Sequence, residues 1–479
     1  MLGADLPRRV LHPNNKIRRD SHAERVMETC TMTTPLSWSI PALIDKEQPG
    51  AFQWRVLILC FVIALFDGFD TQAIAFTGPA ILASFHLQTG ALAPILTAGI
   101  VGMTVGAMTL GLVADRIGRR PAIMVGLALF GMSTLATAWA TEPNHILVLR
   151  FIAGLGMGGC TPVLLALAAE YGPARLRGTI MTGVLLGLPA GAMLGGLLAA
   201  RMQSVIGWQG IFVVGGAAPL AMLVLAFMLL PESLYYKATR GDALSQRYIG
   251  DVLAKIVTRP LPADARYTVP DEAVVKASVK ALFGGGNSGK TVAIWAVYLL
   301  NWVAWFMLLS WLPTVLKAAG LPATQAPLGT VIVNAVFIVC AIPLSFILPR
   351  VDTRRLLGSM FVLGIAVALG LSYAGENWTL VFILVGIAGL GVGGQQIALN
   401  YLIAGAYPTA LRATATGWAI GMGRAGAIAG SAIGGTFLAW GGPSGFFLAL
   451  AAPLAGAAIA VLSLRLSHAS TDAAMSASH

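Results

Sequence analysis

The sequence predicts an all-α membrane protein of twelve transmembrane helices, arranged as two six-helix bundles. Composition is the first of three observations that support this fold. The 479 residues are 57% hydrophobic and 11% charged, with a mean hydropathy of +0.79, whereas an ordinary soluble domain is about a quarter charged. Charges this sparse do not cover the surface of a water-soluble protein of this length, so most of the surface must face lipid.

The second observation is a series of apolar segments of about 20 residues, the length that a helix needs to cross a bilayer. We expect six helices near 54–76, 91–113, 121–140, 146–169, 179–200 and 209–230. Six more are expected near 291–313, 326–348, 355–374, 378–402, 413–438 and 444–466. The predicted organisation is a tail at 1–50, a bundle at 51–230, a central loop at 231–290, a second bundle at 291–466 and a tail at 467–479.

The third observation is a similar segment at the same position in each half of the sequence. The segment 111–120, GLVADRIGRR, links the second and third predicted spans, and 349–355, PRVDTRR, links the eighth and ninth. The two segments hold the same place in their halves. A duplicated six-helix unit is the expected build of a secondary transporter.

The basic residues between the spans orient the array. The even-numbered loops carry Arg116, Arg119, Arg120, Arg175, Arg177, Arg350, Arg354, Arg355 and Arg412, and the central loop adds more. The odd-numbered loops carry little beyond Arg201 and Lys317. By the positive-inside rule, both termini and the central loop are expected in the cytoplasm. Basic loops also account for the net charge of +11 without a nucleic-acid partner.

The cysteines and histidines predict no metal site and no cofactor. Four cysteines, Cys30, Cys60, Cys160 and Cys340, are scattered, and the six histidines fall in tails or loop-like segments. Three of the cysteines lie in apolar runs, where cysteine behaves as a small hydrophobic residue.

The segment 284–291, GGGNSGKT, matches the phosphate-binding pattern G-x-x-x-x-G-K-[ST]. Such a loop needs a buried strand before it and a helix after it within an α/β domain. Here the preceding residues 274–283 predict an amphipathic helix, and Thr291 begins a predicted span. We therefore predict a flexible linker in which Lys290 anchors the seventh span, and no nucleotide ligand. The rival hypothesis is a nucleotide-binding membrane enzyme or sensor.

Two carboxylates lie about halfway along the first span, in Asp67-Gly-Phe-Asp70-Thr71. A charge at mid-bilayer costs roughly 2.5–3.5 kcal/mol on insertion scales, so each carboxylate needs a partner or a water-filled cavity. Asp67 and Asp70 are three residues apart and share one helix face. Two carboxylates this close in a low-dielectric cavity do not both ionise easily. We predict that they carry a coupled proton; the alternative is a pair that only forms a salt bridge with an arginine of another helix.

Arginines, amides and indoles inside other spans are candidates for substrate binding. Arg150, near the outer end of the fourth span, fits either a substrate anion or a counter-ion to Asp67 or Asp70. A second buried arginine, in the eleventh span, and polar groups in the seventh and tenth would suit a planar aromatic carboxylate. The candidate substrate-binding residues are Arg150, Arg424, Gln395, Gln396, Asn400 and Trp302. For the aromatic side chains alone, including Trp305 and Phe306, ordinary packing is the stronger interpretation.

Charged residues at the cytoplasmic ends of the spans predict a gating or structural role. Asp115 can cap a helix or pair across the bundle in one conformation, and Glu170, after the fourth span, lies at the same depth. The candidate gating residues are Asp115, Arg116, Arg119, Arg120, Glu170 and Arg412.

These residues together resemble the major facilitator superfamily. Gly111-x-x-x-Asp115-Arg116-x-Gly118-Arg119-Arg120 matches its loop 2–3 signature, and Pro349 stands roughly where the second-half aspartate would be. Within the superfamily, the chain is similar to the aromatic acid:proton symporters from about residue 36 to 465. The matching segments are Gln53-Trp-Arg-Val, Asp67-Gly-Phe-Asp-Thr71, Glu170-Tyr-x-Pro with Arg175 and Arg177, Ser310-Trp-Leu-Pro313, Tyr407-Pro-Thr with Arg412, and Gly423-Arg424-x-Gly426.

The resemblance implies proton-driven import of benzoate-like acids, the 4-hydroxybenzoate class, through a bacterial inner membrane by a monomer that is not an enzyme. It implies that Asp67, Asp70, Asp115, Arg150, Glu170, Arg412 and Arg424 matter for transport. It begins after the basic tail, so Met27 and Met32 are possible alternative starts.

Two other transport functions remain open. Drug–proton antiporters of the superfamily carry Gly-Pro-x-x-Gly-Gly in the fifth span, where this chain has 187–196, GLPAGAMLGG. The missing Gly-Pro step disfavours an efflux antiporter. The other alternative is a symporter for a non-aromatic organic acid.

Overall fold

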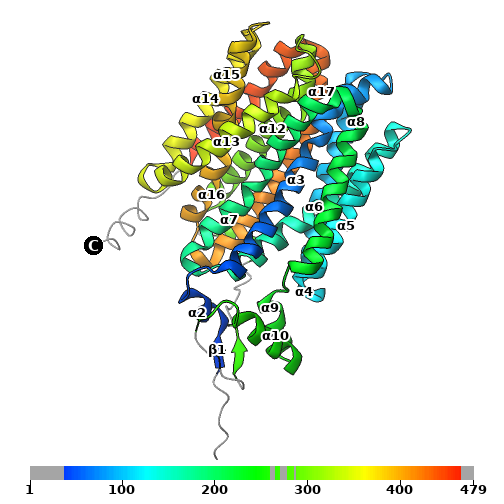
Figure 1. Cartoon of the computed structure of the whole chain (residues 1–479). Coiled ribbons are helices and arrows are strands. Elements are labelled where there is room, and N and C mark those ends of the chain that lie inside the picture. Colours follow the sequence, from blue (N-terminus) through cyan, green and yellow to red (C-terminus); the bar gives the residue numbers. More distant parts are fainter. Residues whose placement is uncertain (1–36, 259–260, 262–264, 270–277, 285–286, 465–479) are drawn as a thin grey trace, which may run out of the picture.

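The computed structural model describes residues 37–258, 261, 265–269, 278–284 and 287–464, and its long helices run side by side (Figure 1). The helices of the first half are α3 (Ala51–Ser84), α4 (Leu92–Ile117), α5 (Arg119–Thr137), α6 (Pro143–Tyr171), α7 (Arg177–Leu185) and α8 (Gly187–Leu229). Those of the second half are α12 (Ser288–Ala318), α13 (Pro327–Ile347), α14 (Thr353–Tyr373), α15 (Trp378–Ala388), α16 (Gln395–Ala406) and α17 (Thr409–Ser463). A π-helical turn, Gly389–Gly393, joins α15 to α16.

Ten helical segments of the described chain are long and apolar enough to cross a membrane, and two of them are each two passes. Ala174–Leu229 and Ala410–Ser463 have 56 and 54 residues. As straight helices they would reach about 80 Å, against a hydrocarbon core of about 30 Å. Gly207 (φ 66°, ψ −179°) and Gly442 (φ 60°, ψ −161°) break them in a backbone region that is essentially open to glycine alone. The described part of the chain therefore makes twelve passes, which confirms the predicted fold.

A small layer covers one end of the first half, beneath the bundle in Figure 1. It consists of β1 (Ser37–Ser39), α2 (Ile40–Asp45), α9 (Leu234–Arg240), α10 (Ala243–Leu253) and β2 (Arg266–Thr268). β1 pairs in parallel with β2, with Ser37 opposite Arg266. We call this end of the molecule, which also carries Arg116 and Arg350, the basic end.

Two sequence predictions for this layer need correction. We expected residues 37–45 to belong to a tail and 234–268 to a loop, but the structure folds parts of both into the layer. Several of their apolar side chains, among them Ile40 and Ile249, are fully buried against the first half. The helix predicted at 274–283 appears as α11 (Val279–Phe283), and residues 270–277 lie outside the described chain.

Two buried clusters show how the halves meet. One cluster runs through the second half and takes in residues of the first half: Phe76 and Leu92 join Trp311 and Val315 far from the basic end. Lys317 Nζ also donates a hydrogen bond to the Pro79 carbonyl there, at 3.3 Å. The other cluster lies towards the basic end, and all of its described members come from residues 38–269. The halves are thus joined at the end opposite the basic end.

Candidate functional site

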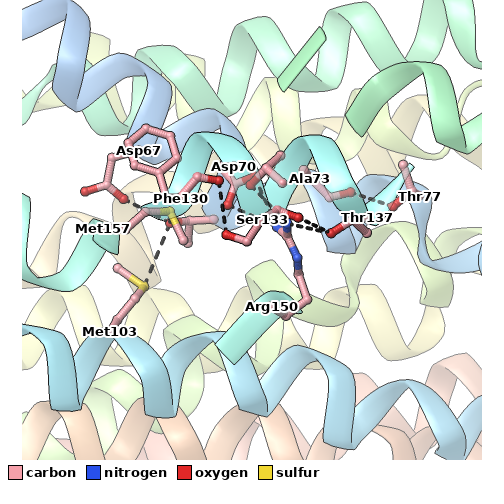
Figure 2. A network of polar contacts seen from close by, with 12 residues as sticks. Asp67, Asp70, Ala73, Thr77, Met103, Phe130, Ser133, Thr137, Arg150 and Met157 are labelled. Atoms are coloured by element: carbon pink, nitrogen blue, oxygen red, sulfur yellow. Dashed lines mark hydrogen bonds and ion pairs between the residues drawn. The ribbon is translucent and has the colours of Figure 1, made fainter. Parts of the chain in front are cut away.

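Helix α3 brings two buried carboxylates to the middle of the first half, where Figure 2 shows them beside α6. Asp67 and Asp70 are each only 1% exposed. Their three-residue spacing was expected to place them together on one face. In the structure, however, each carboxylate binds a different set of partners, so they form two neighbouring sites rather than a shared one.

Asp70 forms an ion pair with Arg150 of α6. Arg150 Nη1 lies 3.1 Å from Asp70 Oδ1 and 3.0 Å from Oδ2. Arg150 Nη2 donates to the hydroxyl oxygens of Thr134 and Thr137 on α5, at 3.0 and 3.1 Å. Thr134 in turn donates to Asp70 Oδ1, at 2.6 Å. The pair is buried and hydrogen-bonded on several sides, as an ion pair out of water must be.

The Arg150 guanidinium also stacks on an aromatic ring. Its central carbon lies 5.0 Å from the centre of the Phe212 ring on α8. At this distance the negative face of the ring attracts the cation. In this structure Arg150 is therefore paired with Asp70, one of the partners that the sequence left open, while its buried Nε has no hydrogen-bond partner.

Asp67 has hydroxyl partners instead. Thr161 on α6 donates to Asp67 Oδ2 at 2.5 Å, and Thr71 donates to Oδ1 at 3.3 Å. Arg424 on α17 lies close enough to Asp67 for an electrostatic interaction. Among the described residues, no ion pair within 4.0 Å involves Asp67. Asp67 is therefore the carboxylate that faces the second half without a direct salt bridge.

A cavity of about 20 Å³ lies between α3, α4 and α6. Asp70, Thr71 and Arg150 supply the polar part of its lining, and the rest is apolar, including Met103 and Met157. This volume is enough for one water molecule when polar groups are present to bind it. Since Thr71 also contacts Asp67, such a water would lie between the two carboxylate sites.

The second half holds another polar cluster, which includes four of the candidate substrate-binding residues. Trp302 Nε1 on α12 donates to Gln396 Oε1 at 2.5 Å, and Gln396 Nε2 donates to Asn400 Oδ1 at 3.1 Å. Trp302 stacks on Phe306 with ring centres 5.5 Å apart. Arg424 lies 5.7 Å from the Trp302 ring centre, so a cation, an indole and two amides share one site.

Gln395 does not belong to this cluster by any described contact. Its side chain is fully buried and donates back to the Gly391 carbonyl of the π-helical turn before α16, at 2.5 Å. Its Oε1 atom is buried without a partner. Gln395 and Gln396 are neighbours in sequence, so their side chains leave the helix about 100° apart. The sequence pattern alone did not separate their environments.

The candidate gating residues divide into two groups. Arg119 and Glu170 form an ion pair, and Ser233 donates to Glu170 Oε2 at 2.6 Å. Arg120 donates to the Phe227 carbonyl and stacks on the Phe227 ring. The side chains of the second group are exposed at the basic end: Asp115, Arg116 and Arg412.

Glu232, which the sequence analysis did not single out, binds the start of α5. Its Oε1 atom accepts hydrogen bonds from the backbone N–H groups of Arg119, Arg120 and Ser233, at 2.9, 3.1 and 2.7 Å. The first N–H groups of a helix lack partners within the helix and favour negative charge. The Pro231-Glu-Ser233 segment after the sixth span was the only signal, and it did not point to α5.

The described end of the GGGNSGKT segment runs directly into α12. Lys290 Nζ donates to the Ala406 carbonyl at 2.7 Å and lies over the Tyr407 ring. Thr291 Oγ1 donates to the Leu282 carbonyl at 2.6 Å. Both side chains that a phosphate-binding loop would use thus make packing contacts. No group of three or more metal-binding side chains occurs among the described residues.

Comparisons with known proteins agree with this architecture. A family model described as Major Facilitator Superfamily matches residues 60–386 and 294–475. The chain is 36% identical over 421 residues to the gallate transporter of Pseudomonas putida, covering 88% of this chain and 93% of that protein. It is 33% identical over 404 residues to the 4-hydroxybenzoate transporter PcaK of Pseudomonas aeruginosa, covering 84% and 90%.

Solved structures show the same fold at lower identity. The xylose transporter XylE of E. coli, in a partially occluded inward-open conformation, superposes with a TM-score of 0.64 at 17% identity, covering 87% of this chain and 100% of that one. From the family match, the identity to the two transporters and the twelve-pass fold, we conclude that the chain belongs to the major facilitator superfamily, in the family that includes these aromatic acid transporters.

Proposed function

We propose that this multi-pass membrane protein is a proton-coupled symporter that imports a small aromatic carboxylate of the benzoate and 4-hydroxybenzoate class. The observation that carries the proposal is the pair of buried carboxylates on α3, one ion-paired with Arg150 and the other facing Arg424 without a salt bridge. The names of the relatives, a gallate transporter and 4-hydroxybenzoate transporters, support an aromatic acid as substrate.

Asp67 and Arg424 are proposed to couple the proton to the substrate. While Asp67 is ionised, it attracts Arg424 across the two halves. Protonation of Asp67 removes that attraction and frees the Arg424 guanidinium for a substrate carboxylate, which it can bind through two parallel N–H groups. The proton and the anion therefore bind together, and the pair that enters the site carries no net charge.

The Asp70–Arg150 pair would keep its charges balanced through this step. Its buried position and threonine partners hold both ions in place. A water in the adjoining cavity would connect Asp70 to Thr71, which contacts Asp67. In this account Asp70 takes part in proton transfer, and Arg150 is mainly its counter-ion.

The indole and amide groups around Arg424 are proposed to recognise the aromatic ring. Trp302 and Phe306 present stacked rings, and aromatic rings prefer such stacked or edge-on neighbours. Gln396 and Asn400 supply polar groups for ring substituents. Gln395, which is buried against the π-helical turn before α16, becomes a supporting residue rather than a contact for substrate.

The basic end and both termini are proposed to lie in the cytoplasm of a bacterial cell. The exposed arginines at this end follow the positive-inside rule. The buried contacts between Phe76 or Leu92 and the second half lie at the opposite end, which supports a site that opens towards the cytoplasm in this conformation. We propose a monomer, since each six-helix half finds its partner within the chain.

The experiment is uptake of labelled 4-hydroxybenzoate into cells that express the protein, with and without an uncoupler. We expect accumulation above the empty-vector control, and we expect the uncoupler to abolish it. Competition by gallate, benzoate and non-aromatic acids then identifies the class of substrate. Competition by non-aromatic acids alone, or lower cell content than in the control, would replace the proposal by one of its two alternatives, an organic acid symporter or an efflux antiporter.

A further inference from the structure

A groove between α13 and α14 takes no part in the proposed transport path. It has a volume of about 380 Å³. Its lining includes Pro343, Leu344 and Ile347 on α13, Ser359 and Leu363 on α14, and Leu390 in the π-helical turn. Ser359 is the one polar residue among the nine that line it, so an apolar occupant fits the groove.

The groove lies at the basic end and on the outer side of the second half. Ile347 is three residues before Arg350, and Ser359 follows Arg355 by one helical turn. The neighbouring side chains Phe346 and Val362 are 67% and 61% exposed. In a transmembrane helix, apolar side chains exposed to this degree face lipid. Lipid tails therefore have direct access to the groove.

Positive charge lies at the mouth of the groove. Arg350 and Arg355 are exposed, and Arg354 donates to the Leu462 carbonyl. The one acidic residue in this segment, Asp352, lies 3.6 Å from Arg355 Nε, and the Arg355 side chain is 89% exposed. An exposed pair of this kind contributes little, so it leaves Arg355 available. Three arginines and one aspartate leave an excess of positive charge.

We propose that this groove binds an acyl chain of one anionic phospholipid, whose phosphate headgroup lies against Arg350 and Arg355. The apolar lining matches the tail, and the arginines match a headgroup with net negative charge. A zwitterionic lipid offers the same tail without the net charge, so the site discriminates by headgroup. The bound tail contacts Leu390, in the same transmembrane span as Gln396.

Native mass spectrometry of the purified full chain tests this proposal. The protein is titrated with phosphatidylglycerol or with phosphatidylcholine of the same acyl chains. The first phosphatidylglycerol is expected to bind more tightly. Since a basic residue at an anionic lipid surface is worth roughly fivefold in affinity, the double variant Arg350→Gln, Arg355→Gln should weaken phosphatidylglycerol binding by about 25-fold. Phosphatidylcholine binding should barely change.

A second pair of variants tests the groove itself. Ser359→Phe fills it and should weaken the binding of both lipids, whereas Ser345→Phe, at an exposed serine of α13 outside the groove, should not. Leu363→Trp is the second groove-filling variant if Ser359→Phe does not fold.

The charge control is Lys237→Gln, Arg240→Gln, which removes two positive charges from α9. It should bind phosphatidylglycerol like the unmodified protein. Equal affinity for the two lipids, an equal loss in this control, or unchanged binding in both groove-filling variants would overturn the proposal.

Discussion

At the scale of single residues, the buried Asp70–Arg150 ion pair is the contact whose loss should affect both stability and transport. Both ions are buried, so removing one leaves the other without a partner at a cost of about 3–5 kcal/mol. We expect Asp70→Asn to lower the free energy of unfolding by an amount of this order and to abolish proton-driven accumulation. Thermal unfolding in detergent and uptake in cells measure the two effects.

The double variant Asp70→Asn, Arg150→Gln separates stability from coupling. It removes both charges, so most of the lost stability should return, while accumulation stays absent because Asp70 no longer takes part in proton transfer to Asp67. An Asp70→Asn variant that still concentrates substrate would show that Asp70 does not carry the proton.

The sequence predicted the charged members of this site but not their partners. Asp67, Asp70 and Arg150 stand out because charges are rare in apolar spans. Thr134 and Thr161, which hold them, do not stand out, because a threonine in a membrane helix can bond its own backbone, as Thr77 does here at 2.7 Å. Whether Asp67 or Asp70 pairs with Arg150 depends on how α3 is rotated about its axis relative to α6. A single sequence does not reveal that rotation.

At the scale of elements, Glu232 links the end of the sixth pass to the start of α5. Two of its three hydrogen bonds satisfy backbone N–H groups that the start of α5 leaves without partners, and the third is to Ser233, just before α9. Capping interactions of this kind contribute about 0.5–2 kcal/mol. Glu232→Ala should lower the unfolding free energy by about that amount and reduce the uptake rate.

The conservative variant Glu232→Gln keeps an accepting oxygen at the same place. It should lose less stability than Glu232→Ala in the same thermal unfolding assay. Equal losses of stability in both variants would mean that the negative charge of Glu232 matters more than its hydrogen bonds. The charge would then act by attracting Arg119 or the positive end of the helix dipole.

The sequence predicted the long helices well and the small elements poorly. A span of about 20 apolar residues is a strong local signal, because every backbone group in lipid must be bonded within the helix. The layer formed by α2, α9 and α10 has no such signal. Its helices have between six and eleven residues and owe their stability to packing on the first half, which sequence patterns do not show.

At the scale of the whole molecule, one shared buried cluster joins the halves far from the basic end. Gly196 of α8 lies against Val331 of α13 there: a Cβ atom at Gly196 would be 2.7 Å from Val331 Cγ2. Alternating access requires this contact to open in each cycle. We expect a disulfide between Gly196→Cys and Val331→Cys to stop transport and reduction to restore it.

The matched controls are the two single-cysteine variants under the same oxidant. The oxidant should leave their transport unchanged, because the native cysteines described in the bundle are buried or half-buried. A cross-linked protein that transports at the full rate would mean that the halves do not separate at this end.

The central claim, that Asp67 couples a proton to an aromatic carboxylate, is tested most directly in proteoliposomes. Uptake of labelled 4-hydroxybenzoate would be measured with an imposed proton gradient, acidic outside, and as exchange without a gradient. The unmodified protein should accumulate the acid above its external concentration, whereas Asp67→Asn should exchange it without accumulating it. Gradient-driven accumulation by Asp67→Asn, or none by the unmodified protein for any aromatic acid, would contradict the account.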